Sequence, residues 1–212
     1  MLQAIARLLL RLGGWTAVGG PLECSKAVLI AAPHTSNWDG YWGIVYKVAV
    51  QLDVHWFAKQ SLFWFPLSSL LRAFGGIPLD RKRAGSAVDL AIDMFRTNDS
   101  FYFALAPEGT RSKTRHWKTG FYRIAVGADI PVVLGFFDYD RKRIGLGPPL
   151  TLTGDQQQDL ESLRAFYADI NGRWPEKTGP IEFPPQRRPR NRKNKKGSEP
   201  VSGTDPNDGK GL

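Results

Sequence analysis

Cysteine and histidine are scarce in this chain, which limits the kinds of site that it can build. The 212 residues include one cysteine, Cys24, and three histidines. A single cysteine excludes an internal disulfide framework and is typical of a protein in a reducing compartment. Because so few thiols and imidazoles match no familiar zinc-site spacing, the sequence predicts no metal site.

Long apolar runs are missing as well. No stretch reaches the roughly 18–20 apolar residues that a transmembrane helix requires. The apolar run at residues 4–12 is short and is interrupted by Arg7 and Arg11. No small-residue cleavage site follows it cleanly, so a secretory signal peptide is not expected.

The net charge of +9 is unevenly distributed along the chain. Residues 186–212 carry eight Lys/Arg and three Asp/Glu, a net +5, and residues 1–185 carry the remaining +4. From residue 184 onward Pro, Gly, Asn, Ser and charge dominate, which predicts a disordered basic tail over 184–212. Such a tail suits an anionic partner (membrane lipid, an acidic carrier protein or nucleic acid), or it is simply a solvated segment.

Short apolar segments alternate with helical patterns between residues 15 and 183. This alternation predicts one α/β domain, with a central, largely parallel sheet flanked by helices. The expected strands are 26–32, 54–58, 76–79, 101–106 and 131–137, with one or two edge strands within 141–152. The expected helices are 38–51, 84–97, 120–127 and 155–174.

We expect the first 14 residues to form a unit separate from the α/β domain. Residues 1–12 have helical periodicity, with Arg7 and Arg11 on a different face from the leucines, and two glycines end the segment. We expect an amphipathic helix that lies on a membrane surface. A second apolar region is the other candidate contact, although both segments could instead pack into the core. The stripe of the first is Leu2, Ile5, Leu9 and Leu12, and the second contains Phe63, Trp64, Phe65, Leu67, Leu70 and Leu71.

The first of four short blocks, residues 33–39, lies between a predicted buried strand and a helix. It places His34 at a strand end, where sites of α/β proteins form. Asp39, five residues later, is within reach of one imidazole nitrogen and would leave the other free as a general base. An ordinary helix cap by Ser36 or Asn37, or a surface ion pair, would explain the same residues.

The other blocks follow later strands. Residues 75–81 combine two glycines, which allow close backbone approach, with Arg81, whose planar fork suits a phosphate. Residues 107–112 follow the strongest predicted strand and place Glu108 beside Arg111, either as part of an anion-binding loop or as a turn with a local ion pair. Residues 130–133 indicate the start of a strand.

In order and spacing, the four blocks resemble the phospholipid/glycerol acyltransferase family, which includes the lysophosphatidate acyltransferases. That family carries a His-x4-Asp block, a glycine-to-arginine block, a Glu-Gly-Thr-Arg-Ser block and a Val/Ile-Pro block. The resemblance covers residues 26–136, about half of the chain, and includes a Lys-x-Gly stretch at 118–120. Two positions depart from the family pattern: Pro33 replaces a frequent asparagine, and Pro78 replaces a frequent aromatic residue.

The resemblance assigns roles to seven residues. His34 would be the general base, with Asp39 as its orienting partner, and no covalent enzyme intermediate would be required. Glu108 would organise the neighbouring arginines rather than bind an anion itself. The residues that would shape a site for the acceptor's phosphate are Arg81, Glu108, Gly109, Thr110 and Arg111.

The resemblance also implies the reaction, an O-acyl transfer in phospholipid biosynthesis. A fatty acyl group would move from acyl-CoA or acyl-carrier protein to the hydroxyl of a lysophospholipid such as 1-acylglycerol 3-phosphate, with no cofactor. The alternatives are a different lyso-lipid acceptor, or a thioester hydrolase that uses water.

The expected partners are membrane lipids and the acyl donor. The enzyme would sit on the cytoplasmic face of a membrane, as a peripheral or monotopic protein. Nucleic acid is not expected, because no aromatic residue beyond Phe183 is available to stack on bases beside the basic tail.

Overall fold

Among the residues that the structure describes, seven strands form a single sheet in which every neighbouring pair except one is parallel. The structure is a computed structural model that describes residues 1–80 and 84–185. The strand order is β1-β7-β6-β2-β5-β3-β4, and only β6 and β7 run antiparallel. The predicted α/β fold with a largely parallel sheet is therefore confirmed. The strands are β1 (Thr16–Val18), β2 (Lys26–Ala32), β3 (Val54–Lys59), β4 (Gly76–Leu79), β5 (Phe101–Leu105), β6 (Val132–Asp138) and β7 (Arg143–Leu150).

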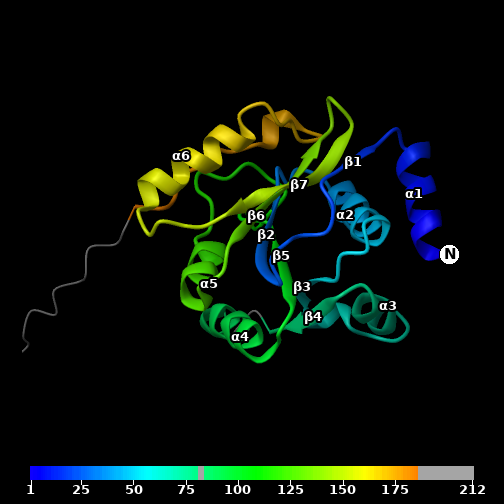
Figure 1. The fold of residues 1–212 in the computed structure, drawn as a ribbon, viewed down its shortest axis with the longest axis horizontal. Helices are drawn as coiled ribbons and strands as arrows, with labels where there is room; N and C mark the ends of the chain where they lie inside the picture. The colour runs from blue at the N-terminus through cyan, green and yellow to red at the C-terminus, as the bar shows by residue number, and fades with distance from the viewer. Residues whose placement is uncertain (81–83, 186–212) are drawn as a thin grey trace, which may run out of the picture.

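Helices cover both faces of this sheet (Figure 1). The helices are α1 (Leu2–Leu12), α2 (Asn37–Ala49), α3 (Leu67–Ala73), α4 (Ala84–Thr97), α5 (Gly120–Ala128) and α6 (Gln156–Tyr167). Side chains of α4, α5 and α6 share one hydrophobic cluster with the sheet. Helices α1 and α2 pack on the opposite face. The molecule is thus a three-layer sandwich, with β2 at the centre of its sheet.

Strand β2 illustrates why the chain folds this way. Its residues alternate in direction, so Val28 and Ile30 join the cluster below α4 to α6, whereas Ala27 and Leu29 face the other layer. Every one of these four side chains is at most 5% exposed. A parallel strand covered on both faces is expected to be a continuous apolar run, which is what residues 26–32 present.

The predicted edge strands at 141–152 were wrong in position. This region forms one strand, β7, which lies inside the sheet between β6 and β1. The edge is β1, which pairs with β7 over Thr16, Ala17 and Val18. A segment of three residues between two glycine pairs is too short to show the alternation of a strand, so β1 could not be predicted from the sequence.

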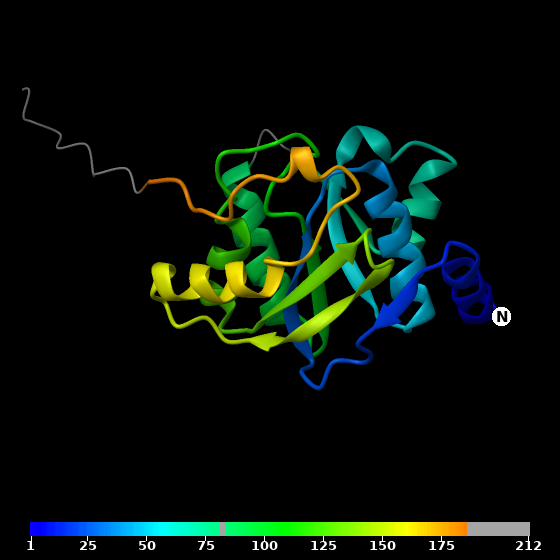
Figure 2. The ribbon, with the colours of Figure 1, turned by 90° about the horizontal axis from the view of Figure 1, so that it is seen from above.

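The predicted helix at 155–174 ends early, at Tyr167. Beyond it, the chain leaves the helix and crosses toward α2 (Figure 2). The N–H of Tyr139 donates to the carbonyl of Asn171 at 2.9 Å. A side chain at Gly172 would meet Oγ1 of Thr35 at 2.8 Å. The tertiary contacts of this segment therefore override its helical periodicity.

Helix α1 packs on α2 through Ala6 and Leu10, which are buried. The predicted apolar stripe is divided, because Leu9 turns toward this cluster while Leu2, Ile5 and Leu12 are exposed. Arg7 donates from Nε to the carbonyl of Ala49, at the end of α2, at 3.2 Å. Within the described residues, no helix is long and apolar enough to cross a membrane.

Candidate active site

The first and third blocks meet at the same edge of the sheet. Strands β2 and β5 are parallel neighbours, with Ile30 paired to Leu105 near their carboxyl ends. His34 and Glu108 each follow their strand by two or three residues. Parallel strands place such loops side by side, so blocks 74 residues apart come into direct contact.

Asp39 lies against the imidazole of His34, as the spacing predicted. Nδ1 of His34 is 3.2 Å from Oδ2 of Asp39, within ion-pair distance, and Nδ1 has no aligned hydrogen-bond partner among the described residues. The same carboxylate closes a capping box, in which Ser36 caps α2 and Asp39 accepts the N–H of Ser36. The helix-cap interpretation and the catalytic interpretation are therefore both satisfied by one side chain.

Asp39 is completely buried and is held by three donors. Its Oδ2 accepts the N–H groups of Thr35 and Ser36, each at 2.9 Å. Its Oδ1 accepts the hydroxyl of Tyr139, which follows β6, at 2.7 Å. Burial, and then the bond to Asp39, raise the pKa of the Tyr139 hydroxyl well above its ordinary value, so this group keeps its proton and donates a hydrogen bond to Asp39. The sequence offered no signal for Tyr139, which is 100 residues from Asp39.

Glu108 contacts the backbone of His34 rather than an arginine. Its Oε1 accepts the N–H of His34 at 3.0 Å, and only 6% of the residue is exposed. Burial raises the pKa of Glu108, while the N–H of His34 opposes the shift. Within residues 1–80 and 84–185, Glu108 has no ion pair with an arginine, and its Oε2 has no hydrogen-bond partner. Because Arg81 lies outside these residues, the expected role of Glu108 as an organiser of cations stays a prediction. The bond to Oε1 holds the loop that carries His34.

The turn after Glu108 is closed by its own backbone. Gly109 adopts a φ of +64°, and its N–H donates to the carbonyl of Ala106 at 3.0 Å. This N–H is therefore not available to an anion, contrary to the expectation for the block. The space where a Cβ would lie is filled by the side chain of Lys118, from the Lys-x-Gly stretch. Thr110 is exposed, and its hydroxyl accepts the N–H of Ser112.

Of the two arginines predicted to bind phosphate, Arg81 and Arg111, the structure describes only Arg111. Arg111 is exposed and lines the cavity that contains His34. Arg81 lies outside the described residues. Gly75, in the same block, is needed where it stands, since its φ is +87° and a Cβ there would clash with the carbonyl of Val54. This close approach positions β4 beside β3.

A cavity of about 400 Å³ extends from His34 between α2 and the sheet. At its polar end lie His34, Asp39 and Arg111. Apart from Lys47, whose amine donates to the carbonyls of Val54 and Phe74, the remainder is mainly apolar. It is lined by residues that include Leu29, Gly43, Ile44, Leu52, Val54, Phe137 and Leu146. Its volume is in the range of small-molecule sites, and its lining suits a hydrocarbon chain with a reactive group at His34.

The segment after α6 adds a cation that the sequence did not indicate. The guanidinium of Arg173 lies 5.6 Å from the ring centre of Trp38 and 5.5 Å from that of Trp174. The N–H of Trp174 donates to Oγ1 of Thr35 at 3.2 Å, which fixes the segment beside the His34 block. Among the described residues, no carboxylate lies within ion-pair distance of Arg173. A predicted helix through residue 174 concealed this placement.

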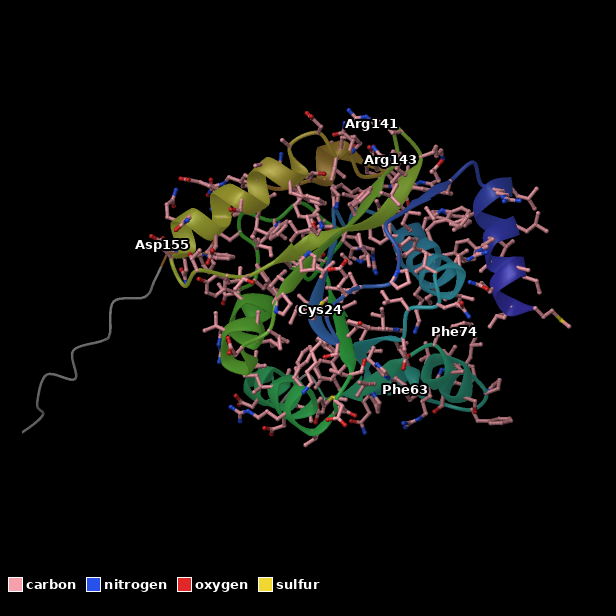
Figure 3. The ribbon with its side chains drawn as sticks, viewed as in Figure 1. Cys24, Phe63, Phe74, Arg141, Arg143 and Asp155 are labelled. Carbon is pink, nitrogen blue, oxygen red and sulfur yellow. The ribbon has the colours of Figure 1, made fainter. Side chains whose placement is uncertain are left out.

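Cys24 lies at the opposite end of β2 from His34. It precedes the strand, His34 follows it, and seven strand residues separate them, which corresponds to about 20 Å. Figure 3 labels Cys24 where the chain enters the sheet. The single thiol is therefore not part of this site.

These features define an enzyme that presents a histidine–aspartate pair at the mouth of an apolar cavity. A model of the Acyltransferase family matches residues 18–133, more than half of the chain. The chain belongs to this family, and the resemblance seen in the sequence is confirmed.

A solved structure supports the fold. The 1-acyl-sn-glycerophosphate acyltransferase PlsC from Thermotoga maritima is similar at a TM-score of 0.54 and 20% sequence identity. The similarity covers 79% of this chain and 73% of that one. At this identity the likeness shows a shared fold. No curated protein matches the chain.

Proposed function

We propose that this acyltransferase moves a fatty acyl group from an acyl thioester to the hydroxyl of a lysophospholipid, such as 1-acylglycerol 3-phosphate. The donor is acyl-CoA or acyl-carrier protein, and no cofactor takes part. The observation that carries the proposal is the position of His34, which joins Asp39 at the polar end of an apolar cavity. A base and a compartment for a long chain are what this reaction requires.

The proton transfer follows from the contacts of the imidazole. Asp39 lies at Nδ1 and favours the tautomer in which Nδ1 carries the hydrogen. This leaves Nε2 to accept the proton of the acceptor hydroxyl as its oxygen attacks the thioester carbonyl. Asp39 then stabilises the imidazolium, because a buried carboxylate lies directly against the new charge.

Collapse of the tetrahedral intermediate completes the transfer. The carbon–sulfur bond breaks and the thiolate leaves, while the ester remains on the acceptor. The proton held by His34 passes to the thiolate or to solvent, which restores the base. No nucleophilic side chain is needed, in agreement with the distant position of Cys24.

Recognition of a phosphate would fall to the cations around the mouth of the cavity. Arg111 lines the cavity and Arg173 lies beside the His34 block on two indole rings. Both carry the planar fork that suits a phosphate. Arg81 remains the predicted third cation of this group.

Membrane attachment is proposed through exposed apolar residues on one side of the molecule. Helices α1 and α3 lie on the same side in both views (Figures 1 and 2). A lipid-soluble substrate reaches an enzyme most directly when that enzyme lies on the bilayer surface. The attachment would be peripheral or monotopic, on the cytoplasmic face. The exposed side chains are Leu2, Ile5, Leu8 and Leu12 of α1, and Leu62, Trp64, Phe65 and Leu70 around α3.

A product assay tests the proposed reaction. The purified full chain is incubated with palmitoyl-CoA or palmitoyl-carrier protein and a panel of lysophospholipids, and the lipid products are identified by mass. We expect a diacyl product that requires His34, with His34→Ala as the matched control. Release of free palmitate at the same rate with and without acceptor would contradict acyl transfer and favour a thioester hydrolase.

A further inference from the structure

The hydroxyl of Tyr139 is a third part of the His34–Asp39 arrangement. It donates to Oδ1 of Asp39 at 2.7 Å, while the backbone donors of Thr35 and Ser36 and the imidazole of His34 are all on Oδ2. The two carboxylate oxygens therefore have different partners. Tyr139 follows β6 and lies beyond residues 18–133, which the family model matches.

Tyr139 is itself held firmly in place. Its backbone N–H donates to the carbonyl of Asn171 at 2.9 Å. Its ring packs edge-on against Trp15, with centroids 4.9 Å apart. The hydroxyl is therefore aimed at Asp39 by contacts from two other parts of the chain, one before β1 and one after α6. A residue fixed in this way supports a constant geometry at the carboxylate.

We propose that Tyr139 is a positioning residue that sets how strongly Asp39 favours protonation of His34. A hydrogen bond from the tyrosine withdraws negative charge from the carboxylate and holds its plane. The proposal rests on the role of His34 as the base, as proposed above. It adds a residue that acts on His34 only through Asp39.

The direction of the effect follows from the charges. Without the hydroxyl, the negative charge of Asp39 is less stabilised by hydrogen bonding. The carboxylate then stabilises the imidazolium of His34 more strongly, so His34 remains protonated to a higher pH. A base that is protonated is inactive, and the acid limb of the pH–rate profile therefore moves to higher pH.

Other charged groups surround His34 and Asp39, and they are the same in the wild type and in a Tyr139→Phe variant. Removal of one hydroxyl changes none of them, so a shift of the profile reports the hydrogen bond itself. These groups are Glu108 against the backbone of His34, Arg111 in the cavity, Lys118 over Gly109, Lys142 at 5.8 Å from the Tyr139 ring centre, and Arg173 over Trp38.

The chain offers a matched control for Tyr139→Phe. Tyr122 of α5 donates its hydroxyl to Oδ2 of Asp159 at 2.8 Å, and both residues are buried. Tyr122→Phe thus removes a buried tyrosine–aspartate bond that does not touch His34. Any loss of stability from such a bond should be similar in the two variants.

The experiment records kcat/KM against pH for the wild type, Tyr139→Phe and Tyr122→Phe in the acyl-transfer assay. We expect the acid limb of Tyr139→Phe to move upward by about 0.5–1 pH unit, the shift that one hydrogen bond to a charged group can produce. The profile of Tyr122→Phe should coincide with that of the wild type. An unchanged or downward-shifted limb in an active Tyr139→Phe protein would overturn the proposal.

A direct titration separates this proposal from the proposed reaction. NMR of the full chain with ¹⁵N-labelled histidine, assigned with His34→Ala, follows the protonation of His34 without any substrate. The same upward shift is expected in Tyr139→Phe. Should that variant fail to fold, 3,5-difluorotyrosine at position 139 keeps the ring and makes the hydroxyl a stronger donor. His34 should then titrate at lower pH than in the wild type, and an equal or higher midpoint would refute the inference.

Discussion

Replacement of Asp39 should separate two roles that one carboxylate performs. It caps α2 through the N–H of Ser36, and it lies 3.2 Å from Nδ1 of His34. Asp39→Asn keeps the size of the side chain and one acceptor oxygen. That oxygen can still accept the N–H groups of Thr35 and Ser36. The hydroxyl of Tyr139 can rotate so that its oxygen accepts a hydrogen bond from the new amide N–H. The cap is therefore largely retained, but the charge beside the imidazole is lost.

The expected magnitudes differ for rate and stability. Loss of the orienting charge should lower kcat by about 10²–10⁴, the contribution of a positioned general base. The stability cost of Asp39→Asn should be about 1–2 kcal/mol, because most donors keep a partner. Asp39→Ala leaves the buried N–H groups of Thr35 and Ser36 without an acceptor, at about 1–3 kcal/mol for each. Asp39→Ala should thus be far less stable than Asp39→Asn, but its kcat should be no lower than that of Asp39→Asn.

A third variant completes the test by changing the cap alone. The Ser36 side chain accepts the N–H of Trp38 at 3.2 Å, so Ser36→Ala should cost about 1 kcal/mol of stability and leave kcat close to that of the wild type. Thermal unfolding and single-turnover acyl transfer are measured on all three variants. Rates that decline in step with stability across the series, or near-normal turnover by a folded Asp39→Asn protein, would refute the assignment.

Four further predictions concern the base, the cavity, the cations and the membrane face. His34→Ala should fold normally, as checked by circular dichroism, and its rate of product formation should fall about 10²–10⁴-fold; near-normal turnover would contradict the mechanism. Gly43→Leu should fill the cavity, since a Cβ there meets only Phe137, at 3.6 Å. Its kcat/KM for palmitoyl donors should therefore fall at least about tenfold relative to shorter acyl donors, and an unchanged chain-length profile would place the acyl chain elsewhere. Arg111→Gln and Arg173→Gln should each raise KM for lysophosphatidate more than for a neutral monoacylglycerol; equal effects on both acceptors would remove these residues from phosphate recognition. Leu8→Glu with Leu12→Glu should reduce flotation with liposomes at any salt, because these side chains are 54% and 76% exposed and do not support the fold; full binding by the double variant would exclude α1 as the attachment.

The sequence predicted the central features of the site because they are local. His34, Ser36 and Asp39 lie within six residues, between an apolar strand and a helix, and short-range geometry alone brings them together. Their spacing and strand-end position were sufficient to predict the contact that the structure shows between His34 and Asp39.

The contacts that the sequence missed all depend on distant parts of the chain. Tyr139 is 100 residues from Asp39, and the N–H of Trp174 is 139 residues from the Thr35 hydroxyl that accepts it. Periodicity predicted that residue 174 lay in a helix, which would have pointed Arg173 elsewhere. Glu108 beside Arg111 suggested an ion pair, but Oε1 of the buried glutamate accepts the N–H of His34, and its Oε2 has no hydrogen-bond partner among the described residues. In each case a tertiary contact decided the outcome, and no local pattern records it.

The site is therefore built from two parts of the chain, one inside the region that the family model matches and one after it. The base, its carboxylate, Glu108 and Arg111 lie within residues 18–133, where the family model matches. The donor to Oδ1 of Asp39 follows β6, and the cation over Trp38 follows α6. Tyr139 and Asn171 are joined by a backbone hydrogen bond, so the end of β6 and the segment after α6 are in direct contact beside the His34 block. We therefore expect the contacts that orient the base and the cation over Trp38 to depend on each other. A change in the segment after α6 should alter proton transfer as well as acceptor binding.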